Sequence, residues 1–111
     1  MAGEFRLELM PPAQRELEEI ARLYLALSGP QSARRITDAL YAALEQLERF
    51  PYSGPALREP ELRSLGYRCI VAGKYVAVYR VMEKTVVVYH IFDGRSDYPA
   101  LFKGEVFSGE G

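Results

Sequence analysis

Two neighbouring runs of β-branched and aromatic residues constrain this chain more than any other feature. The first run extends from Tyr75 to Val81 and the second from Thr85 to Phe92, with Glu83-Lys84 between them. Residues of these types favour strands, and so short a connection suits a β-hairpin. The second run stops at Asp93-Gly94, so the polar residues that follow are held at the end of a rigid strand. The sequence therefore predicts a hairpin that carries a polar cluster, including the cation Arg95, suited to recognition of an anion.

The residues before this hairpin predict one short edge strand and two helices. Apolar and charged residues alternate from Phe5 to Leu9, which is the period of a half-buried strand. Two segments of helical period follow, separated by Ser28-Gly29-Pro30, and Pro51 is expected to end the second helix. Their apolar residues recur at three- and four-residue spacing: Leu17, Ile20, Ala21, Tyr24 and Leu25 in the first, and Ala33, Ile36, Leu40, Ala43, Leu44, Leu47 and Phe50 in the second.

The complete order predicts a small α+β fold. Pro51 to Pro60 has the composition of a loop, and Tyr67 to Ala72 is expected to form a further strand. The resulting order is β-α-α-β-β-β, with the helical hairpin packed on one face of a small, mainly antiparallel sheet. A chain of 111 residues with 49% hydrophobic content favours one domain over residues 1–111, in which residues 103–111 are expected to be a flexible tail.

The charge is unevenly distributed along the chain. The net charge is only −1, but residues 1–50 carry six arginines against eight acids, whereas residues 62–95 carry six cations against two acids. The basic half could face a phosphate backbone or an acidic protein partner. A general RNA-binding module is one alternative, although a pI of about 5.9 argues against it.

Cysteine and histidine content limits the chemistry. Cys69 is the single cysteine, so an internal disulfide is excluded, and we expect it to be a small buried residue in a strand. With one histidine and scattered carboxylates, no metal-ligand set is visible, and no cofactor is expected. Neither a signal sequence nor a membrane-spanning apolar run is visible, so the sequence predicts a cytoplasmic protein.

Four segments carry a resemblance to a known family. They are LEQLERFPYSG, the following ELRSLGY, the strand GKYVAVYRV and the ending VVVYHIFDGRSDYPALF. In this order and at this length they resemble the RelE/ParE superfamily of bacterial toxins from type II toxin–antitoxin operons. The resemblance extends to about Phe102.

The resemblance implies a toxin that a cognate antitoxin neutralises, with one of two targets. ParE-like members inhibit DNA gyrase by protein contact, and RelE-like members cut mRNA on the ribosome by metal-free acid–base chemistry. Residues implied as catalytic in an endoribonuclease are Arg95, Arg68, Arg63, His90 and Tyr98. Those implied in partner binding are Arg63, Arg68, Lys74, Arg80 and Arg95, and the protein could assemble as a homodimer or a toxin–antitoxin hetero-oligomer.

The pattern FPYSGPALREPELRSLGYR, followed by GKYVAVYRV and DGRSDYPALF, is nearer to the ParE-like branch, and Asp93 stands where many chains have a histidine that could transfer a proton. Val76 stands where both branches often have arginine, which favours the alternative of an inactive family member. Tyr98 and Phe102 only approximate the late catalytic aromatic residue. We therefore expect a ParE-like toxin, with an mRNA endoribonuclease or an inactive family member as alternatives.

Each candidate residue also has a structural interpretation. His90 alternates with Val86 and Val88, so it could be a sheet residue on their side of the strand. Arg95 could pair with Asp93 or Asp97. The other basic candidates could form the solvated face of a sheet: Arg63, Arg68, Lys74 and Arg80.

Overall fold

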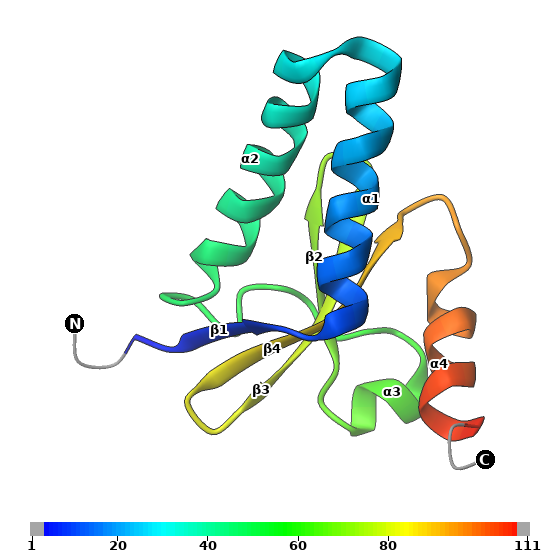
Figure 1. Cartoon of the computed structure of the whole chain (residues 1–111). Coiled ribbons are helices and arrows are strands. Elements are labelled where there is room, and N and C mark those ends of the chain that lie inside the picture. The colour runs from blue at the N-terminus through cyan, green and yellow to red at the C-terminus, as the bar shows by residue number, and fades with distance from the viewer. Residues whose placement is uncertain (1–3, 109–111) are drawn as a thin grey trace.

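The computed structural model, which describes residues 4–108, confirms the predicted α+β fold (Figure 1). Four strands form one sheet in the order β1-β4-β3-β2, in which β1 is parallel to β4 and the other pairs are antiparallel. Two long helices follow β1, and two helices that the sequence did not predict lie later in the chain. The elements are β1 (Arg6–Leu9), α1 (Pro11–Ser28), α2 (Pro30–Gln46), α3 (Pro60–Ser64), β2 (Arg68–Ala72), β3 (Tyr75–Met82), β4 (Thr85–Asp93) and α4 (Tyr98–Ser108).

A single residue, Gly29, joins the two long helices. Its N–H donates to the Leu25 carbonyl at 3.0 Å to close α1, and its own carbonyl accepts from Ala33 N–H at 3.1 Å to begin α2. Gly29 has φ of +94°, a conformation that residues with a side chain rarely adopt. The tight joint makes the helices antiparallel neighbours, as the spacing of Ser28-Gly29-Pro30 predicted.

The second helix ends earlier than its apolar stripe predicted. Its regular part stops at Gln46, and Leu47 N–H donates to the Leu44 carbonyl in a tighter turn. Phe50, predicted as the last residue of the stripe, is 56% exposed. Proline disfavours helical backbone at the residue before it. Pro51 therefore disfavours a helical conformation of Phe50, and the chain turns away from the core there.

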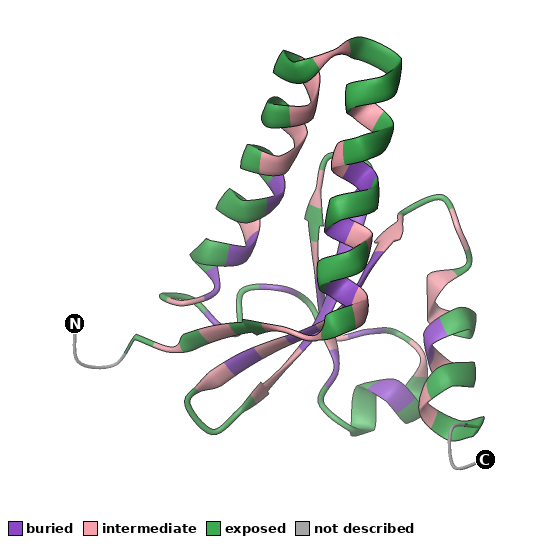
Figure 2. Ribbon diagram, in the orientation of Figure 1, coloured by how far each residue is buried: buried purple, intermediate pink, exposed green. Residues whose placement is uncertain are grey.

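Each face of the sheet carries its own apolar core, as the buried residues in Figure 2 indicate. The first core lies between the sheet and the helical hairpin and includes Leu17, Leu40 and Tyr79. The second lies on the other face and includes Leu62 of α3 and Phe102 of α4. The hairpin therefore covers one face as predicted, and α3 and α4 cover part of the opposite face. Residues 103–108, predicted as part of a flexible tail, continue α4, and residues 109–111 lie outside the described residues.

A β-bulge in β4 changes which way its side chains point. Val78 pairs with His90, but the next residue, Tyr79, pairs with Val88, so Tyr89 is an extra residue. Val86 and Val88 consequently pack in the first core, while the ring of His90 contacts Phe102 in the second. The expectation that His90 shares the side of Val86 and Val88 was wrong, because an extra residue inverts the alternation along a strand.

Within residues 4–108, every helix is too short or too polar to cross a membrane.

Candidate functional site

Arg95 lies just beyond the end of β4 and is held by Asp93. Its Nε donates to Asp93 Oδ1 at 3.1 Å and its Nη2 to Oδ2 at 2.9 Å, while its backbone N–H donates to Oδ1 at 2.9 Å. These hydrogen bonds lower the pKa of Asp93 to about 2. The Arg95 side chain is nevertheless 75% exposed. Arg95 is thus a solvent-facing guanidinium whose orientation is fixed by Asp93 at the same strand end, and the ion pair as a whole carries no net charge.

Lys74 lies at the same end of the sheet. Gly94 N–H donates to the Lys74 carbonyl at 2.7 Å, which fixes the two chain turns side by side. The Lys74 ammonium lies 5.8 Å from the ring centroids of both Tyr24 and Tyr75. Burial, together with the neighbouring Tyr24, raises the pKa of Tyr75 to about 12, so its ring stays neutral beneath this cation. Lys74 and Arg95, both predicted to bind a partner, therefore lie at the same end of the sheet.

Arg68 lies elsewhere, on the face that the helical hairpin covers. It pairs with Tyr79 across the β2–β3 ladder, and its Nη1 donates to the carbonyls of Tyr52 at 3.2 Å and Gly54 at 2.7 Å. The guanidinium also lies 5.1 Å from the centre of the Tyr52 ring. These contacts tie the loop after α2 to the sheet.

Arg80 and Arg63 are associated with the opposite face. The Arg80 guanidinium lies 4.6 Å from the Tyr67 ring and 5.7 Å from the Tyr89 ring, both in the second core. The Nη1 of Arg80 donates to the Leu65 carbonyl, at the end of α3, at 3.3 Å. Arg63 lies in the same short helix, and its side chain is exposed. Arg68 and Arg80 thus lie on opposite faces of the sheet, so a single flat surface cannot contain all five predicted cations.

His90 is enclosed between two carboxylates. The residue is 7% exposed, and its Nδ1 lies 2.8 Å from Glu16 of α1 while its Nε2 lies 2.5 Å from Glu105 of α4. Burial opposes the charge on the ring, but hydrogen bonds to both carboxylates and their negative charge outweigh it, and the pKa of His90 is raised above 6.5. Both ring nitrogens are therefore already occupied.

Tyr98 begins α4 and packs into the second core. Its ring stacks on Phe92 with centroids 6.0 Å apart, and burial raises the pKa of its hydroxyl. Cys69, buried as predicted, lies beside it. Burial likewise raises the pKa of the Cys69 thiol, so both groups are uncharged near neutral pH.

The candidate catalytic residues are not gathered around one point. Arg95 is at one strand end, Arg68 is on the hairpin face, and Arg63 and Tyr98 belong to the helices on the other face. His90, at the edge of β4, is held by Glu16 and Glu105. Within residues 4–108, no group of three or more His, Cys, Asp or Glu side chains could hold a metal ion.

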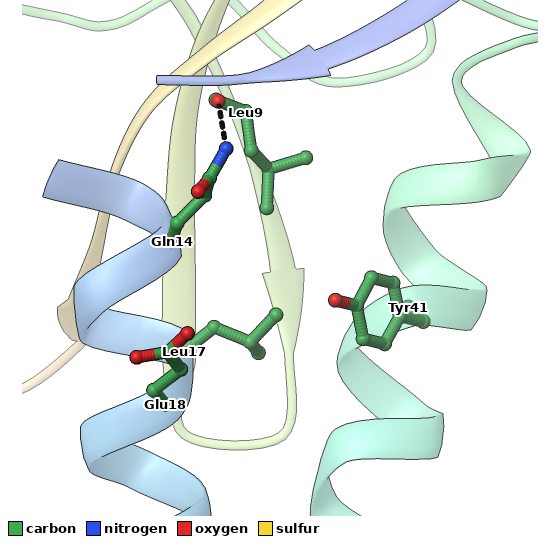
Figure 3. Close-up of a pocket in the computed structure, with 5 residues that line it drawn as sticks. All are labelled: Leu9, Gln14, Leu17, Glu18 and Tyr41. Atoms are coloured by element: carbon green, nitrogen blue, oxygen red, sulfur yellow. Dashed lines mark hydrogen bonds between the residues drawn. The ribbon is translucent and has the colours of Figure 1, made fainter. Parts of the chain in front are cut away.

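Sequence reasoning did not find a groove between α1 and α2 (Figure 3). This groove, of about 320 Å³, is lined by Leu9, Gln14, Leu17, Glu18 and Tyr41. Gln14 closes one end through a 2.9 Å hydrogen bond to the Leu9 carbonyl, and the exposed ring of Tyr41 forms the wall on α2. Tyr41 lies outside the predicted apolar stripe of its helix. An aromatic residue at such a position was the one feature of the sequence that could have indicated the groove. Sequence reasoning also missed Glu16 and Glu105, the two carboxylates that contact His90, and Glu105 lies in the predicted tail.

The fold, with a helical hairpin on one face of a four-stranded sheet, defines a small α+β protein. The chain belongs to the ParE toxins of type II toxin–antitoxin systems, since residues 7–98 match the model of the family described as the ParE toxin of the parDE system. None of the curated proteins matches this sequence.

Structures from two toxin–antitoxin systems are among those that share the fold. The chromosomal ParDE toxin–antitoxin system from P. aeruginosa aligns with a TM-score of 0.69 and 20% identity, over 83% of this chain and 98% of that chain. The toxin–antitoxin complex RelBE2 from Mycobacterium tuberculosis aligns with a TM-score of 0.61 and 23% identity, over 81% of this chain and 98% of that chain. At these identities, the similarity establishes the fold alone.

Proposed function

We propose that this protein is a cytoplasmic ParE-like toxin that arrests growth by inhibiting DNA gyrase through protein contact. The family match supports the toxin class. The observation that favours gyrase over mRNA is the state of His90, whose two nitrogens are both hydrogen-bonded to carboxylates. Cleavage of RNA by attack of a 2′-hydroxyl needs a group free to accept a proton, within reach of cations that stabilise the phosphorane. The dispersed positions of Arg63, Arg68 and Arg95 do not provide that combination.

An antitoxin is the proposed neutralising partner. Two similar structures are of a ParDE system and a RelBE2 toxin–antitoxin complex. This chain offers a groove between α1 and α2 for an apolar helix. Strand β2 lies at the edge of the sheet; its first residues already pair with the segment around Ala56, so the end of the strand, near Val71, is the part that could accept a further strand. The cations Lys74 and Arg95 at the sheet end suit an acidic segment of that partner. Because Arg68 and Arg80 lie on opposite faces, a partner that contacts both must wrap around the sheet.

Arg95→Ala tests the proposed target. Induction of the wild-type chain without antitoxin should arrest growth, and the purified protein should inhibit DNA supercoiling by gyrase. We expect Arg95→Ala to weaken both effects at least about tenfold, because it removes the fixed cation of a charge-assisted contact. The fold should stay intact, because Arg95 lies on the surface and its ion pair is with Asp93 at the same strand end. The matched control is Arg22→Ala, an exposed arginine on α1.

Mapping of mRNA 5′ ends in the arrested cells distinguishes the alternatives. Intact mRNA together with inhibited supercoiling supports the gyrase proposal. Cuts in translated frames that purified ribosomes reproduce would identify an endoribonuclease instead. Normal growth at full expression of a folded protein would identify an inactive family member, and unchanged toxicity of Arg95→Ala would remove Arg95 from the site.

A further inference from the structure

His90 connects two helices that lie on opposite faces of the sheet. Strand β1 ends at Leu9, opposite Val88, so the edge of β4 is uncovered from His90 onward. Glu16 of α1 occupies this uncovered edge, where its Oε1 accepts the Ile91 N–H at 2.7 Å and its Oε2 contacts His90 Nδ1. The bulge turns the ring of His90 toward the second core, where Nε2 meets Glu105 of α4. We refer to Glu16, His90 and Glu105 as the carboxylate–histidine bridge.

The other attachments of α4 to β4 are aromatic contacts: Phe102 packs against Tyr89, and Tyr98 stacks on Phe92. Phe102 is its one buried residue within the described range, with Tyr98 and Val106 partly buried beside it. Lys103 forms ion pairs with Glu59 at 2.8 Å and Glu61 at 2.9 Å, both near the start of α3. The contact between Glu105 and His90 is therefore the polar attachment that joins α4 directly to β4.

We propose that the carboxylate–histidine bridge is a pH-sensitive switch that holds the C-terminal part of α4 on the sheet when His90 is protonated and releases it when the ring becomes neutral. A protonated imidazole donates from both nitrogens, so it satisfies both carboxylates. A neutral ring has one N–H, so one carboxylate then faces a lone pair at hydrogen-bond distance and is repelled.

The structure decides which carboxylate leaves. Glu16 also accepts the N–H of Ile91, a buried backbone donor that would lose its partner if Glu16 moved. The side chain of Glu105 is 58% exposed and can exchange His90 for water at little cost. The neutral ring therefore keeps its N–H on Nδ1 toward Glu16, and Glu105 is released together with the C-terminal part of α4.

The direction of the pH dependence follows from the surroundings of His90. Glu16 from α1 and Glu105 from α4 are the charged groups that contact it, while β3 contributes Val78, and Phe92 and Phe102 pack against the ring. The raised pKa means that the bridge is complete below pH 6.5 and is lost as the pH rises through the higher value of the folded protein. The ion pairs of Lys103 do not change in this range, because Glu59 and Glu61 raise the pKa of Lys103 further above neutrality.

Release of α4 can be measured by amide hydrogen exchange. The helix has 11 residues, and a helix of this length is unstable in water without tertiary contacts, so release exposes its amides. After correction for intrinsic exchange, we expect protection of the amides of Glu105 to Ser108 to fall about tenfold between pH 6 and pH 9, as a charge-assisted hydrogen bond is lost. Protection of Val88 in β4 should stay constant over this range.

Two variants separate the switch from a general loosening of the helix. Glu105→Gln should reduce the protection of α4 amides at pH 6 and abolish the pH step. The neutral amide lacks the charge interaction with protonated His90 and can hydrogen-bond to either form of the ring. Glu61→Gln should reduce protection equally at both pH values and retain the step. Equal protection of wild-type α4 at pH 6 and pH 9, or a full pH step in Glu105→Gln, would overturn the proposal. The result is independent of whether gyrase is the target.

Discussion

At the scale of single residues, Gly54 occupies a position where a side chain does not fit. A β-carbon there would lie 2.2 Å from the carbonyl oxygen of Cys69 and 2.8 Å from the hydroxyl of Tyr79. This hydroxyl is buried, accepts the Gly54 N–H at 3.0 Å and donates to the Pro51 carbonyl at 2.8 Å. We expect Gly54→Ala to lower the free energy of unfolding by about 1–3 kcal/mol, as measured by urea denaturation.

Gly104 provides the control for that substitution. It lies within α4, and a β-carbon there would meet no atom within 4 Å. Gly104→Ala should stabilise the protein by about 0.5–1 kcal/mol, because alanine loses less backbone entropy in a helix. An equal loss of stability in both variants would show that steric contact at Gly54 is not the cause.

The pairing of Asp93 with Arg95 predicts how the protein behaves at acid pH. The side-chain hydrogen bonds from Arg95, followed by the bond from its backbone N–H, hold the pKa of Asp93 at about 2 instead of 3.8. Arg95→Ala should raise this pKa toward, but not fully to, 3.8, since alanine retains the backbone N–H. Carboxyl chemical shifts during an NMR titration measure the change. The stabilisation from this pair is present above pH 3.8 and lost as the pH falls through about 2. A pKa that stays at about 2 in the variant would contradict the assigned cause.

At the scale of elements, Glu16 replaces a strand partner at the edge of β4. Glu16→Ala leaves the buried N–H of Ile91 without an acceptor, which should cost about 1–3 kcal/mol in the free energy of unfolding. Glu16→Gln retains an oxygen that can accept the Ile91 N–H, so this variant should lose less of the free energy of unfolding. Urea denaturation measures both, and exchange of the Ile91 amide reports the local effect. Equal losses in the two variants would mean that the bond to Ile91 is not the source of the stability.

Regular periodicity predicted the elements that pack with one apolar side. The alternation from Phe5 to Leu9 and the stripes through Leu17 and Leu40 predicted β1, α1 and α2 because each buries one face against one core. Helix α3 has one turn, too short to show a period, although Pro60 and the Glu59 side chain that accepts Leu62 N–H mark its start. In α4 the apolar residues lie all around the helix, and it contains Gly104, a poor helix former, so neither an apolar stripe nor helix propensity indicated it.

At the scale of the whole molecule, the family and the fold were predictable, but the grouping of the basic residues was not. The sequence identified the cations, and Lys74 and Arg95 meet because hydrogen bonds join the two turns that carry them. Arg68 and Arg80 separate because the antiparallel register assigns them to opposite faces. The place of His90 depends on one extra residue in β4, a feature that leaves no signal in the pattern of apolar residues.

The parallel pairing of β1 with β4 also limits when this protein can fold during its synthesis. Residues Arg6 to Leu9 leave the ribosome first, but their partners, Thr85 to Val88, are made almost eighty residues later. The helical hairpin emerges in between, before the sheet face that it covers exists. Contacts this distant in sequence form slowly, and a domain folds as a unit once its last strand is available. A chain whose synthesis stops before β4 therefore lacks a complete sheet, so this toxin cannot fold until β4 has been made.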